Sequence, residues 1–130
     1  MRDEIIRKVR DGRIELKGAV LIGRHCQIGD GARIVDSCID NYTILGKNVN
    51  VENSAVMDRA FIGDGAQIDQ SILGRHVTLE STSSKPTKIE KGTTIADDNT
   101  IALGSRLAAS NVYPHQDVPE GVYEGITIRA

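Results

Sequence analysis

The stretches LIGRHCQIGDGARIVDS (residues 21–37), CIDNYTILGKNVNVENS (38–54), AVMDRAFIGDGAQIDQS (55–71) and ILGRHVTL (72–79) repeat one pattern at a fixed period. Aliphatic residues recur at this period in three columns. The columns are Ile22, Ile39, Val56 and Leu73; Ile28, Leu45, Ile62 and Leu79; and Ile34, Val51 and Ile68. A fixed period of this kind predicts a solenoid, in which each repeat packs on its neighbours.

The spacing within one repeat predicts short β-strands. The aliphatic positions are six, six and five residues apart, and a small or short residue stands two positions before each of them. Residues two apart in a strand point to the same side, so each such pair would face inward. Three strands joined by tight corners would form one triangular coil, and parallel coils about 4.8 Å apart would stack into an aliphatic core.

The corners and one irregularity fit this geometry. Gly31, Asn48 and Gly65 follow an inward aliphatic by three residues, where a corner needs a positive φ that Gly adopts freely and Asn tolerates. Lys85 then stands where an aliphatic is expected, so we interpret residues 80–86 as an insertion at a corner. The pattern predicts about five coils, followed by a partial sixth that ends at residue 123.

We divide the chain into three segments. Residues 1–13 are expected to form a helical cap or linker, with a helix over 3–11 that Gly12 ends. Residues 14–123 would form the β-helix, and residues 124–130 a C-terminal tail strand. The predicted fold class is therefore all-β, a parallel β-helix with a short N-terminal helix.

Composition excludes several classes of function. Hydrophobic residues make up 39% and aromatic residues 3%, so the core must be aliphatic. The net charge is −2 and the basic residues form no stripe, so no nucleic-acid partner is expected. No apolar run approaches the ~18 residues of a membrane span, and the N-terminus lacks a secretory signal. Cys26 and Cys38 make neither a disulfide framework nor a zinc site, which is typical of a cytoplasmic protein with free thiols.

Three histidines, His25, His76 and His115, each follow an inward aliphatic by three residues, in one corner column with Tyr42 and Arg59. His25 and His76 would lie three coils apart, roughly 14 Å at the strand spacing. Zinc ligands lie about 2.1 Å from the metal, so these histidines are not expected to bind one ion. Tolerance of histidine at a left-handed corner explains the column more simply.

Six outward positions are apolar where an isolated solenoid would be polar. They are Leu21, Cys38, Ala55 and Ile72 in one column, and Ile44 and Phe61 in another. Single exposed aliphatics are common, but side chains stacked in register form a strip. We interpret this strip as a candidate oligomer interface.

The six-residue pattern over residues 14–123 resembles the hexapeptide-repeat family, which implies a left-handed β-helix. The segments 35–39, 52–56 and 69–73, each with a central Ser, support a finer resemblance, as do the lead-in 14–23 and the tail 112–121. They are similar to the C-terminal β-helix of sugar-1-phosphate nucleotidyltransferases, such as ADP-glucose pyrophosphorylase and mannose-1-phosphate guanylyltransferase.

The nucleotidyltransferase resemblance implies a non-catalytic module that assembles subunits and, in some members, regulates them. The family's catalytic domain is absent from this sequence, so no catalytic, cofactor or metal residue is carried over. The implied partners are copies of this chain or a separate catalytic nucleotidyltransferase domain.

An alternative is a hexapeptide acyltransferase, in which His25 or His76 would act as general base with acetyl-CoA at a subunit interface. No long loop accompanies either histidine to build an acceptor site, which favours the assembly module.

Overall fold

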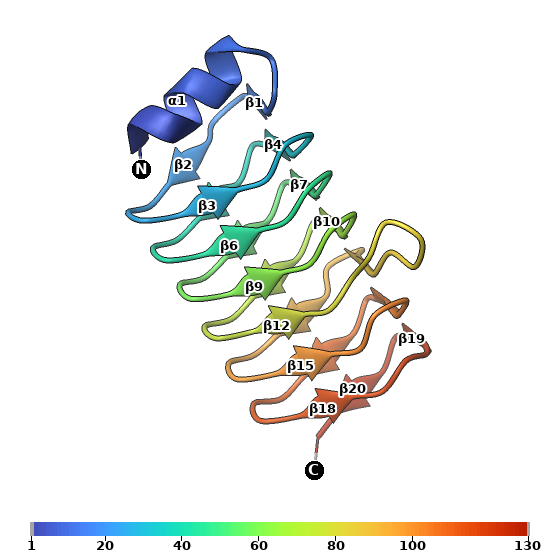
Figure 1. The fold of residues 1–130 in the computed structure, drawn as a ribbon. Coiled ribbons are helices and arrows are strands. Elements are labelled where there is room, and N and C mark those ends of the chain that lie inside the picture. Colours follow the sequence, from blue (N-terminus) through green and yellow to red (C-terminus); the bar gives the residue numbers. More distant parts are fainter. Residues whose placement is uncertain (1, 130) are drawn as a thin grey trace.

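The computed structural model describes residues 2–129 of the chain. Met1 and Ala130, the outermost residues of the predicted cap and tail, lie outside the described part. Helix α1 (Arg2–Arg10) comes first and is followed by short parallel strands that form a triangular β-helix (Figure 1). This all-parallel solenoid with one short helix confirms the predicted fold class.

The strands build three sheets, one for each side of the triangle. The first sheet contains β1 (Glu15–Lys17), β4 (Arg33–Val35), β7 (Asn50–Glu52), β10 (Gln67–Asp69), β13 (Lys88–Glu90), β16 (Arg106–Ala108) and β19 (Val122–Glu124). The second contains β2 (Leu21–Ile22), β5 (Cys38–Ile39), β8 (Ala55–Val56), β11 (Ile72–Leu73), β14 (Thr94–Ile95), β17 (Asn111–Val112) and β20 (Thr127–Ile128). The third contains β3 (Gln27–Ile28), β6 (Ile44–Leu45), β9 (Phe61–Ile62), β12 (Thr78–Leu79), β15 (Thr100–Ile101) and β18 (Asp117–Val118).

The sheets make six complete coils, and the seventh has strands on two sides. Coil 1 consists of β1–β3, coil 2 of β4–β6, and so on to β19 and β20 in coil 7. The predicted count of five coils and a partial sixth is therefore wrong. The predicted coils did not include β1, because Ile14 rather than a small residue stands two positions before Leu16. They also ended before β20, which pairs with β17.

The core is the set of inward aliphatics that the sequence pattern identified. From Ile28 to Val118, each of these side chains is at most 3% exposed. The small residues two positions earlier, such as Cys26, Ala60 and Ala66, are buried as well. Large and small side chains alternate inside each coil and pack the narrow triangle.

Positive φ angles mark the corners. His25, Tyr42, Arg59 and His76 have φ between 56° and 60° at the corner between the second and third sheets. At the corner between the first and second sheets, coils 2, 3 and 4 turn through one residue of positive φ, namely Asp36, Asn53 and Gln70. Coils 1 and 5 use a longer corner containing Gly18 or Lys91–Gly92, so the five-residue side is not present in every coil.

The predicted insertion is a loop between β12 and β13 that projects from the stack (Figure 1). In the first sheet Gln67 pairs with Asn50 of the coil before, at the usual sequence separation of one repeat. It also pairs with Lys88 of the coil after, and this separation is four residues longer. An antiparallel bridge between Thr82 and Lys85 closes the loop, and Lys85 Nζ contacts Glu120 at 2.8 Å.

Helix α1 lies over the N-terminal end of the stack, as Figure 1 shows. Its Ile5 is 7% exposed, and Lys8 Nζ donates to the carbonyl oxygen of Ile28 at 2.7 Å. Gly12, with φ of 75°, follows the end of the helix. In residues 2–129 there is no helix long and apolar enough to cross a membrane.

Candidate assembly face and histidine corner

The outward apolar column of the second sheet, Leu21, Cys38, Ala55 and Ile72, is called the assembly face below. The four side chains belong to adjacent strands and pair in register from coil to coil. Leu21 is 70% exposed and Ile72 is 51% exposed. With Cys38 and Ala55 between them, they form a continuous apolar strip. In coils 5 to 7 the same column becomes polar, with Thr94, Asn111 and Thr127. The apolar surface is therefore confined to the first four coils.

A shallow hollow of about 690 Å³ lies in this face. It exists because Cys38 and Ala55 are small, whereas Ile72 projects at one end. The corner residues Asp36, Asn53 and Gln70 line its edge. A hollow bounded by a projecting aliphatic is a shape that another surface can fill.

A ladder of serine hydroxyls supports the edge of this hollow. Ser37 Oγ donates to the Val35 carbonyl at 2.7 Å and accepts the Ser54 N–H at 3.0 Å. Ser54 Oγ donates to the Glu52 carbonyl at 2.7 Å and accepts the Ser71 N–H at 3.1 Å. Each hydroxyl thus satisfies a buried amide of the next coil, which explains why serine recurs at this position.

The other two interface candidates lie on a different side of the triangle. Ile44 is half-buried and Phe61 is 48% exposed, and both point outward from the third sheet. Between them and the assembly face runs the corner that carries Tyr42 and Met57, two further exposed side chains. The structure therefore places the six predicted residues on two adjoining faces rather than on one flat surface.

The predicted histidine column exists at that corner. The rings of His25 and Tyr42 stack at 5.1 Å between centroids, with 19° between their planes. The guanidinium of Arg59 lies 5.0 Å from the Tyr42 centroid. His76 lies at the corner of coil 4, three coils from His25 in coil 1.

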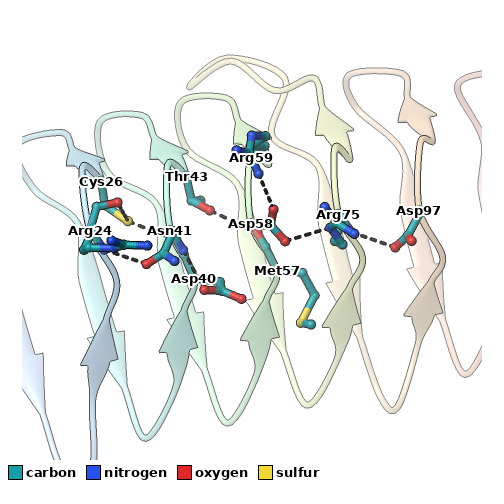
Figure 2. Close-up of polar contacts among 10 residues, drawn as sticks. All are labelled: Arg24, Cys26, Asp40, Asn41, Thr43, Met57, Asp58, Arg59, Arg75 and Asp97. Atoms are coloured by element: carbon teal, nitrogen blue, oxygen red, sulfur yellow. Dashed lines mark hydrogen bonds and ion pairs between the residues drawn. The ribbon is translucent and has the colours of Figure 1, made fainter.

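Beside the histidines, Asp58 joins two arginines across coils (Figure 2). Asp58 Oδ2 accepts from Arg59 Nη1 at 2.7 Å, and Asp58 Oδ1 lies 2.9 Å from Arg75 Nε. Asp97 Oδ1 in turn accepts the backbone N–H of Arg75 at 2.8 Å. Burial alone would raise the pKa of Asp58, but the charge of Arg75 and the bonds from both arginines outweigh it and lower the pKa.

This ion cluster was not among the sites predicted from the sequence. The available signal was that Asp58 and Arg75 are separated by one period of the repeat, which places them one above the other in adjacent coils.

Two of the corner histidines contact neighbouring side chains. The ring of His25 stacks on that of Tyr42, and a carboxylate oxygen of Asp98 lies 3.8 Å from His115 Nδ1. A general base needs a partner that orients its ring, and the side-chain contact of His25 in the described part of the chain is the ring of Tyr42. Residues 2–129 also contain no group of three His, Cys, Asp or Glu side chains able to hold a metal ion.

A family model described as the EIF2B subunit epsilon LbH domain matches residues 7–107 of the chain. LbH denotes the left-handed β-helix, so the predicted hand of the solenoid and its hexapeptide repeat are confirmed. No curated protein matches the sequence.

Solved structures with the same fold include GDP-perosamine N-acetyl transferase from Caulobacter crescentus, in complex with CoA and GDP-perosamine. One mutant of that enzyme gives a TM-score of 0.62 at 16% identity, covering 96% of this chain and 60% of that chain. Another gives 0.59 at 16% identity, covering 97% and 59%. The chain spans about three fifths of the length of these acetyltransferases, and the likeness shows the fold.

Proposed function

The chain belongs to the EIF2B subunit epsilon LbH domain family of left-handed β-helices, and from this premise we propose that it is a non-catalytic assembly module of the sugar-phosphate nucleotidyltransferase type. In this proposal its work is to bring protein subunits together, as copies of itself or around a separate catalytic chain. The two free cysteines, Cys26 and Cys38, agree with the reducing cytoplasm as its compartment.

The observation that carries this proposal is the assembly face. Leu21 is 70% exposed and Ile72 is 51% exposed on one regular sheet, and Ile72 borders the hollow. Removing an aliphatic side chain of this size from water contributes about 1.5–3 kcal/mol when the burial is complete. An apolar strip on a rigid sheet is the usual signature of a protein contact.

The competing function is acyl transfer from acetyl-CoA, with His25 or His76 as base. It requires a histidine that a second group holds in one tautomer and orientation. His25 instead stacks on Tyr42, and both histidines occupy positive-φ corner positions that account for them structurally. The contacts at this corner therefore favour assembly over catalysis.

The assembly proposal is tested by the native mass of the tagged protein in extracts of its own cells. We expect a species well above the 14.1 kDa of one chain. The variant Ile72→Asp should weaken that association about tenfold or more, because it places a charge in the contact. Gln67→Asp, on the outward side of the first sheet, is the matched control and should leave the mass unchanged. A wild-type extract that contains only the single chain would overturn the proposal.

A calorimetric titration with acetyl-CoA separates the two functions. The assembly module should show no saturable heat. Micromolar binding that is lost in both His25→Ala and His76→Ala would instead support acyl transfer.

A further inference from the structure

We propose that the occupant of the assembly face is a second copy of this chain, related by a two-fold axis that runs parallel to the strands and passes over Ala55. The inference rests on the proposed assembly function and specifies its partner and register. In this arrangement the two stacks run in opposite directions. Coil 3 faces coil 3 of the other copy, coil 2 faces coil 4, and coil 1 faces coil 5.

The shape of the face favours this register. Ile72 in coil 4 would project into the hollow above the partner's Cys38 in coil 2, and by symmetry the partner's Ile72 would fill the hollow above Cys38. Ala55, the small residue on the axis, lets the two sheets approach closely. Ile72 of each copy thus meets the small Cys38, which is how packed interfaces reach the density of a core. Leu21 in coil 1 lies opposite the partner's Thr94 in coil 5.

A two-fold axis along the stack would pair each coil with itself and leave the hollow unfilled. Leu21 would meet the partner's Leu21 and Ile72 the partner's Ile72, so large side chains would oppose each other at both ends. Cys38 and Ala55 would face their small counterparts across a gap in the middle. The poor fit of these side chains therefore disfavours a two-fold axis along the stack.

Charges beside the face agree with the proposed axis. The corner that follows the second sheet carries Arg24 and His25 in coil 1, and Asp97 and Asp98 in coil 5. All four residues are exposed, and coil 1 faces coil 5 in this arrangement. Arg24 would thus lie opposite the partner's Asp97 on both sides of the axis.

The same corner brings two like charges together in coil 3, where Asp58 would approach the partner's Asp58. Each of these carboxylates is already paired with Arg59 and Arg75 of its own chain. The paired arginines offset the repulsion, so this contact does not oppose the proposed axis.

The contact is small, which sets the expected affinity. Five strands at about 4.8 Å spacing give a face only about 20 Å tall. The buried area then falls at the low end of specific interfaces, where association is weak. We expect a concentration-dependent dimer in the micromolar range rather than an obligate one.

Disulfide trapping of the purified full chain tests the register. In Ile72→Cys, the introduced thiol should lie against the partner's Cys38. Oxidised glutathione should then convert each thiol pair to a disulfide and be reduced to two glutathione molecules. The same two positions within one chain are two coils apart, about 9.6 Å, which exceeds the roughly 7 Å between Cα atoms that a disulfide spans. The product should therefore be a covalent dimer.

Two control proteins define the result. The wild type should not cross-link, because Cys38 and the partner's Cys38 are two coils out of register. Asn111→Cys, in the same outward column, should give about tenfold less dimer than Ile72→Cys, because a docked pair raises the effective thiol concentration only at facing positions. A third variant, Ala55→Cys in a Cys38→Ser background, should cross-link on the axis.

Wild-type cross-linking through Cys38 would overturn the proposed axis. A purified chain that sediments as a monomer at all concentrations, with no more cross-linking in Ile72→Cys than in Asn111→Cys, would overturn the second copy as occupant. If the extract still shows a large species sensitive to Ile72→Asp, the assembly function stands with a different partner. If the extract shows the single chain, both proposals fail.

Discussion

The hydroxyl of Ser54 accepts the backbone N–H of Ser71 at 3.1 Å, one coil further along the stack. Both residues are buried, so this N–H has no water to replace the bond. The same relationship joins Ser37 to Ser54 at 3.0 Å. A side chain in one coil thus completes the backbone of the next, and the stacking of coils depends on it.

We expect Ser54→Ala to lower the free energy of unfolding by about 1–3 kcal/mol, because it leaves the buried N–H of Ser71 unpaired. Equilibrium unfolding in urea measures this loss. Ser54→Thr is the matched control and should cost less, since Thr93 occupies the same row in coil 5 and its hydroxyl accepts the Ser110 N–H at 3.3 Å. Equal stability of the alanine and threonine variants would show that the hydroxyl is dispensable.

Gly29 is a position with no room for a side chain. A Cβ there would lie 2.6 Å from the carbonyl carbon of Gly46 and 2.7 Å from the backbone nitrogen of Lys47. Since both atoms belong to the next coil, Gly29→Ala must push two coils apart, at a typical cost of about 1–3 kcal/mol. Thermal unfolding should show a larger loss than for Gly12→Ala, where the φ of 75° strains an alanine but no atom lies within 4 Å of the added group. The reverse order would contradict the close packing of coils.

The two thiols should differ in reactivity. Cys26 is fully buried, its Sγ lies 3.0 Å from the Asp40 carbonyl oxygen, and burial raises its pKa, whereas Cys38 is exposed. An aromatic disulfide reagent should therefore label Cys38 rapidly and Cys26 only after unfolding. The Cys38→Ser variant should show no fast phase. Two fast thiols in the native wild type would mean that the core opens at coil 1.

The ion pairs of Asp58 should make the free energy of unfolding fall as the pH is lowered. Its folded-state pKa is lowered, so its contribution is present above the unfolded pKa of about 3.8 and is lost as the pH falls through the folded pKa. Asp58→Asn should therefore destabilise the protein at neutral pH, and its difference from the wild type should shrink in acid. Urea unfolding of the wild type and of Asp58→Asn, from neutral pH into acid, measures this difference in stability. Asp11→Asn, a change at an exposed residue, is the control. A difference that persists unchanged in acid would exclude the ion cluster as its source.

The repeat made most of the fold predictable. Inward and outward positions, corners and parallel stacking all follow from period and strand geometry, and the core from Ile28 to Val118 matches the predicted columns. The ends were missed because terminal coils depart from the repeat: Ile14 replaces a small residue before β1, and β20 follows a corner at Gly125. The longer corner at Gly18 was hidden for the same reason, whereas the one at Lys91–Gly92 lies in coil 5, just after the inserted loop.

The surface was less predictable than the core. Spacing placed Leu21, Cys38, Ala55 and Ile72 in one exposed column, but the hollow at their centre depends on side-chain size and corner geometry together. The stacking of Tyr42 on His25 depends on rotamers that no sequence period specifies. The Asp58 cluster depends on which residues of adjacent coils lie one above the other, as Asp58 and Arg75 do.

The loop between β12 and β13 shows what the stack tolerates. Four residues beyond the usual repeat enter between Gln67 and Lys88, yet the paired strands on both sides stay in register. The length of the chain at this corner can therefore change without shifting the strands. Lys85 of the longer loop contacts Glu120, two coils further along the stack. This corner is the natural position at which to graft a peptide epitope or a fluorophore without disturbing either the assembly face or the core.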